Sequence, residues 1–185
     1  MEKPRIVISG AEARKKIQRG AEKVAEVVGS TLGPYGRNVL LDRGYRFPKI
    51  TNDGITVARE IILEDEVEQM GAMTLVEAAK RTNQDAGDGT TSATVIAAAI
   101  LEKGFNLLGG SEYEVGSERN VMKLKKEIDE AKKQVIEEIK KRSIPVTTQD
   151  ELEHIAICSS ENEDLGKKLA EIVKTIGQDG CVIVE

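Results

Sequence analysis

The chain has 185 residues, enough for one domain with a proper hydrophobic core, or for one domain and a small second one. Its 32 acidic and 27 basic side chains give a net charge of −5, which argues against a general nucleic-acid binder, because such proteins show a basic face. Aromatic residues make up only 3% and tryptophan is absent, so the core must consist of aliphatic side chains.

Several further classes of protein are excluded. No apolar run is long enough to span a bilayer, and the first residues do not resemble a signal peptide. His154 is the only histidine, which excludes the usual histidine-based triads and argues against a histidine-ligated zinc site. Cys158 and Cys181 form no close motif and are expected to be buried small hydrophobes in a reducing compartment. We therefore expect a cytoplasmic protein that binds neither nucleic acid nor membrane.

Hydrophobic periodicity predicts a mainly α-helical fold. We expect the helix over 91–107, which is apolar nearly all round, to lie at the core. The long helix over 120–142 should turn its apolar stripe inward, namely Leu124, Ile128, Ala131, Val135 and Ile139. The complete set of expected helices covers 11–30, 55–62, 64–85, 91–107, 120–142, 150–158 and 163–176.

Strands are few in this sequence. We expect a hairpin over 38–41 and 49–51, with isolated strands over 5–9 and 181–184. A lone hairpin and a terminal strand both need partners, so the hairpin should pair with another element and the chain should end at a cut. Residues 109–119 are polar and are expected to form a solvated loop. Ser143-Ile144-Pro145 ends the long helix and predicts a domain boundary, with one domain over 1–142 and part of another over 143–185.

The stretch from Asp85 to Val95 joins two predicted helices and has the character of a phosphate-binding loop. Gly87 and Gly89 allow a sharp turn and a close approach of the backbone to a bulky anion. Thr90, Thr91 and Ser92 follow at the start of a helix, where unpaired N–H groups and the helix dipole favour phosphate. Asp88 would repel a bare phosphate, so its presence predicts a Mg²⁺ ion between the carboxylate and the phosphates.

An ordinary turn is the alternative for this stretch. Asp88 or Thr90 could simply cap the following helix. The stretch also lacks the Gly-Lys-Ser/Thr ending of a P-loop, and Ser92 stands where a dinucleotide fingerprint has its third glycine. The argument for a ligand must therefore come from other parts of the chain.

Two other loops share this composition. Thr31-Leu32-Gly33-Pro34-Tyr35-Gly36 ends the first helix, and Asn52-Asp53-Gly54 begins the second. Each has a simple structural explanation, a helix stop for the first loop and a helix cap or turn for the second. As part of a ligand site, the first would offer backbone groups, and Asp53 would offer a base or a group that orients water.

Three motifs together resemble the group I chaperonins, the GroEL type. They are Thr31-Leu32-Gly33-Pro34-x-Gly36-Arg37-Asn38, Ile50-Thr51-x-Asp53-Gly54-Ile55-x-Val57-Ala58-Arg59-Glu60 and Gly87-Asp88-Gly89-Thr90-Thr91. Leu63-Glu64-Asp65, Met70-Gly71-Ala72 and Ser143-Ile144-Pro145 also fit. The resemblance extends over essentially the whole chain, which would correspond to roughly the first third of a family member.

This resemblance implies an ATP-dependent chaperone that assembles into a homo-oligomeric ring and assists the folding of non-native client proteins, with a lid co-chaperonin as a further partner. Residues 1–142 would be the first part of the ATP-binding equatorial domain, a multihelical domain with a β-hairpin. Residues 143–185 would be the first part of a small α+β intermediate domain that acts as a hinge. The apical domain and the second halves of the other two would be absent. The hairpin around 37–51 would pair with a neighbouring subunit.

The resemblance also assigns roles to residues. ATP and Mg²⁺ are the implied cofactors, with K⁺ as a further cation. Asp88 would hold Mg²⁺, and Asp53 would lie beside the γ-phosphate and orient the attacking water, because phosphoryl transfer depends mainly on positioning and charge neutralisation. The remaining nucleotide-binding residues implied are Thr31, Leu32, Gly33, Pro34, Asn52, Gly54, Gly87, Gly89, Thr90, Thr91 and Ser92.

The sequence departs from the GroEL pattern by three substitutions and one longer loop. Tyr35 and Asn52 replace lysines, and Ser92 replaces a threonine but keeps the hydroxyl. The stretch over 110–119 is longer than the corresponding family loop. The carboxylate that drives hydrolysis in the family comes from a later part of the chain, so these 185 residues are expected to bind Mg-ATP weakly or not at all and to turn it over poorly. The alternative is a non-catalytic interaction protein that keeps the fold. A group II chaperonin is disfavoured by Arg37-Asn38 and by Val57-Ala58-Arg59-Glu60.

Overall fold

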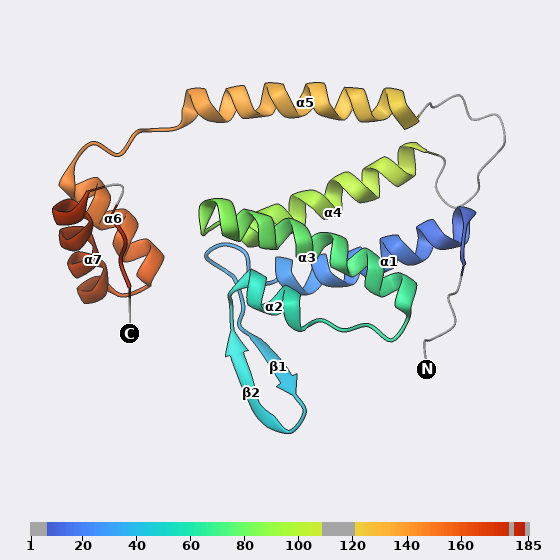
Figure 1. Ribbon diagram of the computed structural model, residues 1–185, viewed down its shortest axis with the longest axis horizontal. Coiled ribbons are helices and arrows are strands. Elements are labelled where there is room, and N and C mark those ends of the chain that lie inside the picture. The colour runs from blue at the N-terminus through green and yellow to red at the C-terminus, as the bar shows by residue number, and fades with distance from the viewer. Residues whose placement is uncertain (1–6, 109–120, 178–179, 184–185) are drawn as a thin grey trace. The chain divides into compact units, whose positions relative to one another are not determined.

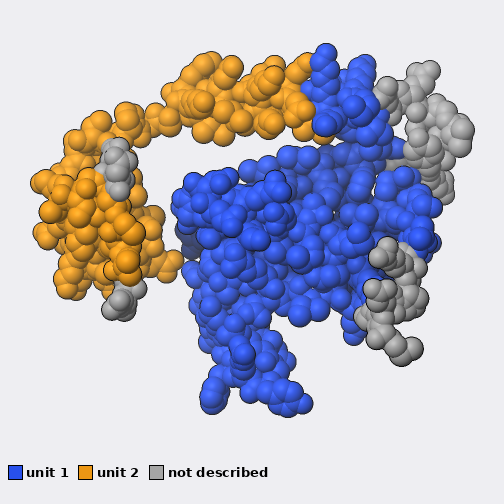
Figure 2. Space-filling view, viewed as in Figure 1, with its two compact units in different colours: residues 1–127 blue, residues 128–185 orange. Residues whose placement is uncertain are grey.

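A computed structural model describes residues 7–108, 121–177 and 180–183, and within them the fold is mainly α-helical with one antiparallel hairpin (Figure 1). The chain divides into two compact units, residues 1–127 and 128–185, which are coloured separately in Figure 2. The elements in chain order are α1 (Gly10–Gly29), β1 (Val39–Arg43), β2 (Arg46–Thr51), α2 (Gly54–Glu60), α3 (Glu66–Ala86), α4 (Thr90–Leu107), α5 (Val121–Arg142), α6 (Gln149–Ser160) and α7 (Glu163–Ile176). The predicted helices are confirmed, with ends that differ by about two residues or fewer.

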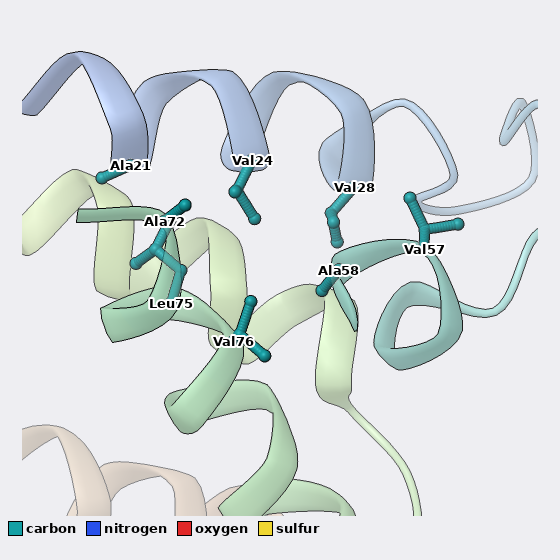
Figure 3. Close-up of a cluster of buried hydrophobic side chains, with 8 residues drawn as sticks. All are labelled: Ala21, Val24, Val28, Val57, Ala58, Ala72, Leu75 and Val76. Carbon is teal, nitrogen blue, oxygen red and sulfur yellow. The ribbon is translucent and has the colours of Figure 1, made fainter. Parts of the chain in front are cut away.

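The core of unit 1 lies between α1, α2 and α3 (Figure 3). Helix α1 contributes residues at helical spacing, Ala21, Val24 and Val28, because these lie on one face of the helix. They pack against Val57 and Ala58 of α2 and against Ala72, Leu75 and Val76 of α3. The buried residues are aliphatic, as the scarcity of aromatic residues predicts.

Two glycines allow α1 and α3 to pack backbone against backbone. A Cβ on Gly20 would lie 1.8 Å from Glu68 O, and one on Gly71 would lie 2.0 Å from Ile17 O. Each glycine therefore faces the backbone of the other helix, where no larger residue fits.

Ion pairs reinforce the same helix pair. Lys16 Nζ lies 2.6 Å from Asp65 Oδ2, and Asp65 Oδ1 caps α3 by accepting hydrogen bonds from Val67 N and Glu68 N. The hydrogen bond from Lys16 is the largest of the effects that lower the pKa of Asp65 to about 2. Glu68 is a buried carboxylate, and Lys23 Nζ at 2.6 Å and Arg19 Nε at 3.4 Å compensate its charge.

The hairpin β1–β2 projects from this core. Strand β1 pairs with β2 from Val39↔Thr51 to Arg43↔Arg46, with a bulge that gives β2 one extra residue near Pro48, where the missing N–H is tolerated. Leu41 is buried, but the apolar residues of the other face and the tip are exposed, namely Leu40, Tyr45, Phe47 and Ile50. Within the described residues the hairpin has no third strand, so the expected partner strand is not found in this part of the chain.

The two predictions about buried helices were wrong. Helix α4 is not the central core helix, because only Thr90 and Thr94 are buried in it, while Ala97, Ala98 and Leu101 cover the core from one side. Helix α5 has no buried residue, and of its predicted inward stripe only Leu124 is half-buried. In both cases periodicity identified an apolar helix but not how much of it neighbouring elements cover.

Unit 2 is built on the helix pair α6 and α7. Thr148 and Glu151 form a capping box at the start of α6, and Asn162 Oδ1 caps α7 by accepting from Leu165 N. Gly166 lets the helices approach closely, since a Cβ there would lie 2.4 Å from Ile157 Cα. The hydrogen bonds from Thr147 N and Thr148 N are the largest of the effects that lower the pKa of Glu151 to about 2.

The predicted isolated strands are not observed where the structure describes them. Residues 7–9 and 181–183 form no strand, while 5–6 and 184 lie outside the described residues, as does the predicted loop over 109–119. Both cysteines are exposed, so the prediction that they are buried was wrong. The boundary after Arg142 stays a prediction, because the division into units falls within α5. None of the described helices is long and apolar enough to cross a membrane.

Candidate functional site

The chain reverses between α3 and α4 within three residues. Gly87 ends α3 with φ +73°, and Gly89 begins α4 with φ +78°. Both values lie in the left-handed region that glycine adopts without strain. Asp88 lies between them, exposed, and its Oδ1 accepts a hydrogen bond from Gly89 N. The predicted glycine-dependent turn is therefore present, with its carboxylate at the N-terminal end of α4.

The first turn of α4 presents backbone donors that no N-cap side chain satisfies. Gly89 occupies the N-cap position and has no side chain, so the usual hydroxyl or carboxylate cap is missing. Thr90 is buried, and its carbonyl accepts a hydrogen bond from Thr94 Oγ1 at 2.8 Å. Thr91 is half-buried and Ser92 is exposed. An anion at this end would therefore meet backbone N–H groups and the hydroxyls of Thr91 and Ser92.

Asp53 caps helix α2. Its Oδ2 accepts hydrogen bonds from Thr56 N at 3.1 Å and from Thr56 Oγ1 at 2.5 Å, and its own N–H donates to Thr51 Oγ1. The capping role predicted as the simple alternative is thus observed. Capping also fixes the carboxylate at the start of α2 while leaving it exposed. Sequence reasoning missed Thr51 and Thr56, since the recognisable signal was Asp53 itself, a residue type that commonly caps helices.

Gly54 brings the second and third loops together. A Cβ on Gly54 would lie 2.2 Å from Thr91 Oγ1 and 3.2 Å from Thr91 N. The starts of α2 and α4 are therefore in direct contact. Because Asp53 precedes Gly54 and Asp88 lies three residues before Thr91, the two predicted carboxylates belong to one region of unit 1.

The first loop starts beside the same helix. Gly29, the last residue of α1, lies next to α4, since a Cβ there would be 3.5 Å from Val95 Cγ2. The loop then folds back on itself, because Gly36 N donates to Gly33 O at 2.9 Å and Arg37 N donates to Ser30 O at 2.8 Å. Gly33 has φ +74°, and Leu32, Pro34 and Tyr35 are exposed. The end of α1 thus lies beside the N-terminal half of α4.

A magnesium ion in this region would need further ligands beside those of the protein. Among the described residues no three histidine, cysteine or acidic side chains come together as a metal site. One carboxylate, Asp88, beside the N-terminal end of α4 is nevertheless a donor that suits Mg²⁺, which retains waters and takes phosphate oxygens as ligands. A hollow of about 460 Å³ lies elsewhere, in unit 2, and none of the predicted nucleotide-binding residues lines it.

Comparisons with known proteins point to one family. The model of the TCP-1/cpn60 chaperonin family matches residues 24–179. Among solved structures, the chain is similar to chaperonin gp146 of bacteriophage EL 2 (Pseudomonas aeruginosa), crystallised in the presence of ATP-BeFx. Crystal form II shows 29% identity and a TM-score of 0.73, over 89% of this chain and 28% of that one. Crystal form I shows 26% identity and a TM-score of 0.72, over 91% and 29%. The chain thus spans less than a third of the length of gp146.

Proposed function

Because this chain belongs to the TCP-1/cpn60 chaperonin family, we propose that it forms the ATP-binding part of a chaperonin subunit that assembles into rings and assists protein folding. Residues 1–142 would belong to the equatorial domain and 143–185 to the intermediate domain. The observation that carries the proposal is the contact between Gly54 and Thr91, which joins an acidic cap to a phosphate-binding helix end. The crystallisation of gp146 with ATP-BeFx supports a nucleotide as the ligand.

Phosphate binding, metal binding and positioning of the attacking water would fall to different residues of the site. The N–H groups at the start of α4, with Thr91 and Ser92, would hold the phosphates, and Gly87 and Gly89 allow the backbone to approach them. Asp88 would hold Mg²⁺, which when bound supplies charge neutralisation for phosphoryl transfer. Asp53, oriented by Thr56, would position the attacking water. Thr31–Pro34 and Asn52 would complete the nucleotide-binding surface, and K⁺ would be an additional cation.

Turnover by this chain alone should be slow. Asp53 is the single carboxylate that we assign to water activation, and the resemblance to the GroEL type implies that a second acidic group comes from a later part of the family chain. We therefore expect binding of Mg-ATP with little hydrolysis.

Assembly would use the hairpin. Leu40, Tyr45, Phe47 and Ile50 are exposed on it, an arrangement that suits pairing with a neighbouring subunit. The Arg37-Asn38 and Val57-Ala58-Arg59-Glu60 motifs favour the GroEL type, for which a lid co-chaperonin and non-native clients are the expected partners.

Calorimetric titration of Mg-ATP into the chain tests the nucleotide proposal. We expect saturable binding that Asp88→Asn weakens at least tenfold, because the metal loses its protein ligand. Glu102→Gln is the matched control, since it also removes one acidic charge from unit 1 but lies twelve residues along α4 from Thr90, about 18 Å away. If the unaltered chain does not bind Mg-ATP, the alternative of a non-catalytic interaction protein is favoured instead.

A further inference from the structure

The hairpin is attached to both ends of helix α2. At one end, β2 finishes at Thr51, whose Oγ1 accepts the hydrogen bond from Asp53 N, and Asp53 caps α2. At the other end, Arg43 Nη2 of β1 lies 2.6 Å from Glu60 Oε1, on the last residue of α2. The hairpin therefore contacts both the first and the last turn of α2. These two contacts restrict the rotation of the hairpin relative to the helix.

The electrostatic surroundings favour the pairing of Arg43 with Glu60. Glu60 is at the C-terminus of α2, where the helix dipole disfavours a negative charge, so a neighbouring cation stabilises it. Arg43 faces Arg46 across the strands, and this like charge favours an acidic partner for Arg43 outside the hairpin. The two side chains are only 32% and 34% exposed, so water screens the pair less than a fully exposed one.

Helix α2 is a short and well-anchored connection between the two ends. It has seven residues, about 10 Å of helix, and Ile55, Val57 and Ala58 are buried. Its first residue, Gly54, touches Thr91, and its last residue, Glu60, holds the hairpin. A displacement of the N-terminal end of α2 must therefore move Glu60 as well, unless the helix bends.

We propose that Arg43 and Glu60 are positioning residues that couple the nucleotide site to the direction of the hairpin. This inference rests on the proposed nucleotide site. When Mg-nucleotide binds between Asp53 and Thr91, α2 shifts against α4, and the ion pair carries that shift to β1. The exposed face with Leu40 and Ile50 and the tip with Tyr45 and Phe47 then point in a new direction. Coupling between two binding sites is reciprocal, so a partner that binds the hairpin and changes its direction also alters the affinity for the nucleotide.

The distance between two spin labels measures this coupling directly. One label is placed at Tyr45→Cys on the hairpin tip and one at Lys103→Cys on α4, both exposed, after the exposed native cysteines are changed by Cys158→Ser and Cys181→Ser. The probe is ATP with Mg²⁺, and calorimetry measures its binding to each labelled protein. In the otherwise unaltered chain we expect one dominant distance that shifts when Mg-ATP is added.

The variant Glu60→Gln should broaden the distance distribution and remove the shift, although Mg-ATP still binds. Ion pairs near the surface contribute little free energy. We therefore expect the Arg43–Glu60 pair to raise the population of the paired hairpin orientation by about two- to fivefold. The charge swap Arg43→Glu with Glu60→Arg should restore both the narrow distribution and the shift. Glu77→Gln, which breaks the Arg81–Glu77 pair on α3, is the control and should leave both unchanged.

Three results would overturn the inference. If the spin-label distance in Glu60→Gln shifts on addition of Mg-ATP as much as it does in the unaltered chain, the ion pair does not carry the coupling. If Mg-ATP binds to the unaltered chain without any change in distance, the hairpin is not coupled to the site, while the proposed function stands. If the unaltered chain does not bind Mg-ATP, the proposed function fails and the inference fails with it.

Discussion

Gly54 and Thr91 are 37 positions apart in sequence, yet they lie so close together that a single methyl group on residue 54 would overlap the Thr91 hydroxyl, at 2.2 Å. This contact joins the start of α2 to the start of α4. It explains why residue 54 must be glycine, since Gly54 is not among the positive-φ glycines. The contact also brings the loop over 52–54 and the loop over 87–92, which are far apart in the sequence, into one region of the structure.

The variant Gly54→Ala should disturb the nucleotide site more than the fold. The new Cβ would displace Thr91 Oγ1 and press on Thr91 N, the groups that we assign to phosphate binding. We expect at least a tenfold loss of affinity for Mg-ATP in calorimetry, with helix content by circular dichroism unchanged. Gly104→Ala is the control, because nothing lies within 4 Å of a Cβ there. Equal affinities of Gly54→Ala and the unaltered chain would contradict the assignment of Thr91.

The variant Gly71→Ala should destabilise unit 1. A Cβ at this position would lie 2.0 Å from the carbonyl oxygen of Ile17, so α1 and α3 would have to separate. Overpacking of this kind costs about 1–3 kcal/mol in the free energy of unfolding, which urea titration measures. Gly104→Ala should instead stabilise the protein by up to about 1 kcal/mol, because alanine is the better helix former. Similar effects of the two substitutions would show that the α1–α3 contact is not as close as described.

The stability of both units should fall in acid. Hydrogen bonds lower the folded-state pKa of Asp65, chiefly from Lys16, and that of Glu151, chiefly from Thr147 N, to about 2, from ordinary values of 3.8 and 4.5. A carboxyl with a depressed pKa contributes stability that is fully present above its unfolded pKa and is lost as pH falls toward its folded pKa. Melting temperatures followed by circular dichroism should therefore decrease from about pH 5 to pH 2.

A variant isolates the contribution of Glu151. We expect Glu151→Gln to melt below the unaltered chain at pH 7, with a difference that shrinks as pH approaches 2, where the unaltered carboxyl is also becoming protonated. Glu137→Gln, at an exposed position of α5, should follow the unaltered chain at every pH. A difference for Glu151→Gln that stays constant with pH would mean that the carboxylate charge does not contribute to the cap.

Removal of Mg²⁺ should reverse the effect of Asp88. With Mg²⁺ present, Asp88 supports nucleotide binding through the metal, and Asp88→Asn weakens it. With Mg²⁺ chelated by EDTA, the bare carboxylate beside the phosphates repels them, so Asp88→Asn should bind ATP more tightly than the unaltered chain. Calorimetry in the two buffers measures both affinities. The same ranking of the two proteins with and without Mg²⁺ would rule out a metal-mediated role.

The helices were predictable because their ends carry local signals. Asp53, Asp65, Thr148 and Asn162 are N-cap residues, and Gly87 ends α3 in the left-handed conformation. These signals depend only on residues a few positions apart, which the sequence shows directly.

Burial was harder to predict because it depends on distant neighbours. The apolar periodicity of α4 and α5 was real, but α4 covers the core from one side and α5 is largely exposed. The segments over 7–9 and 181–183 have strand-like sequences without strand structure, because a strand requires a partner to satisfy its backbone groups.

The candidate site was predictable as residues but not as geometry. The glycines, hydroxyls and carboxylates were identified from their loops, whereas the Gly54–Thr91 contact and the Arg43–Glu60 pair arise from tertiary packing. A glycine that serves a close approach is indistinguishable in one sequence from a glycine that serves a turn. Only the fold distinguishes the two roles.

The most direct test of one shared nucleotide site is a Mg-ATP titration followed by the backbone amide signals of Gly54, in the second loop, and of Gly89 and Thr91, in the third. If both loops bind the same Mg-nucleotide, all three signals will shift with one common dissociation constant. Signals from only one loop, or different dissociation constants for the two loops, would contradict the account.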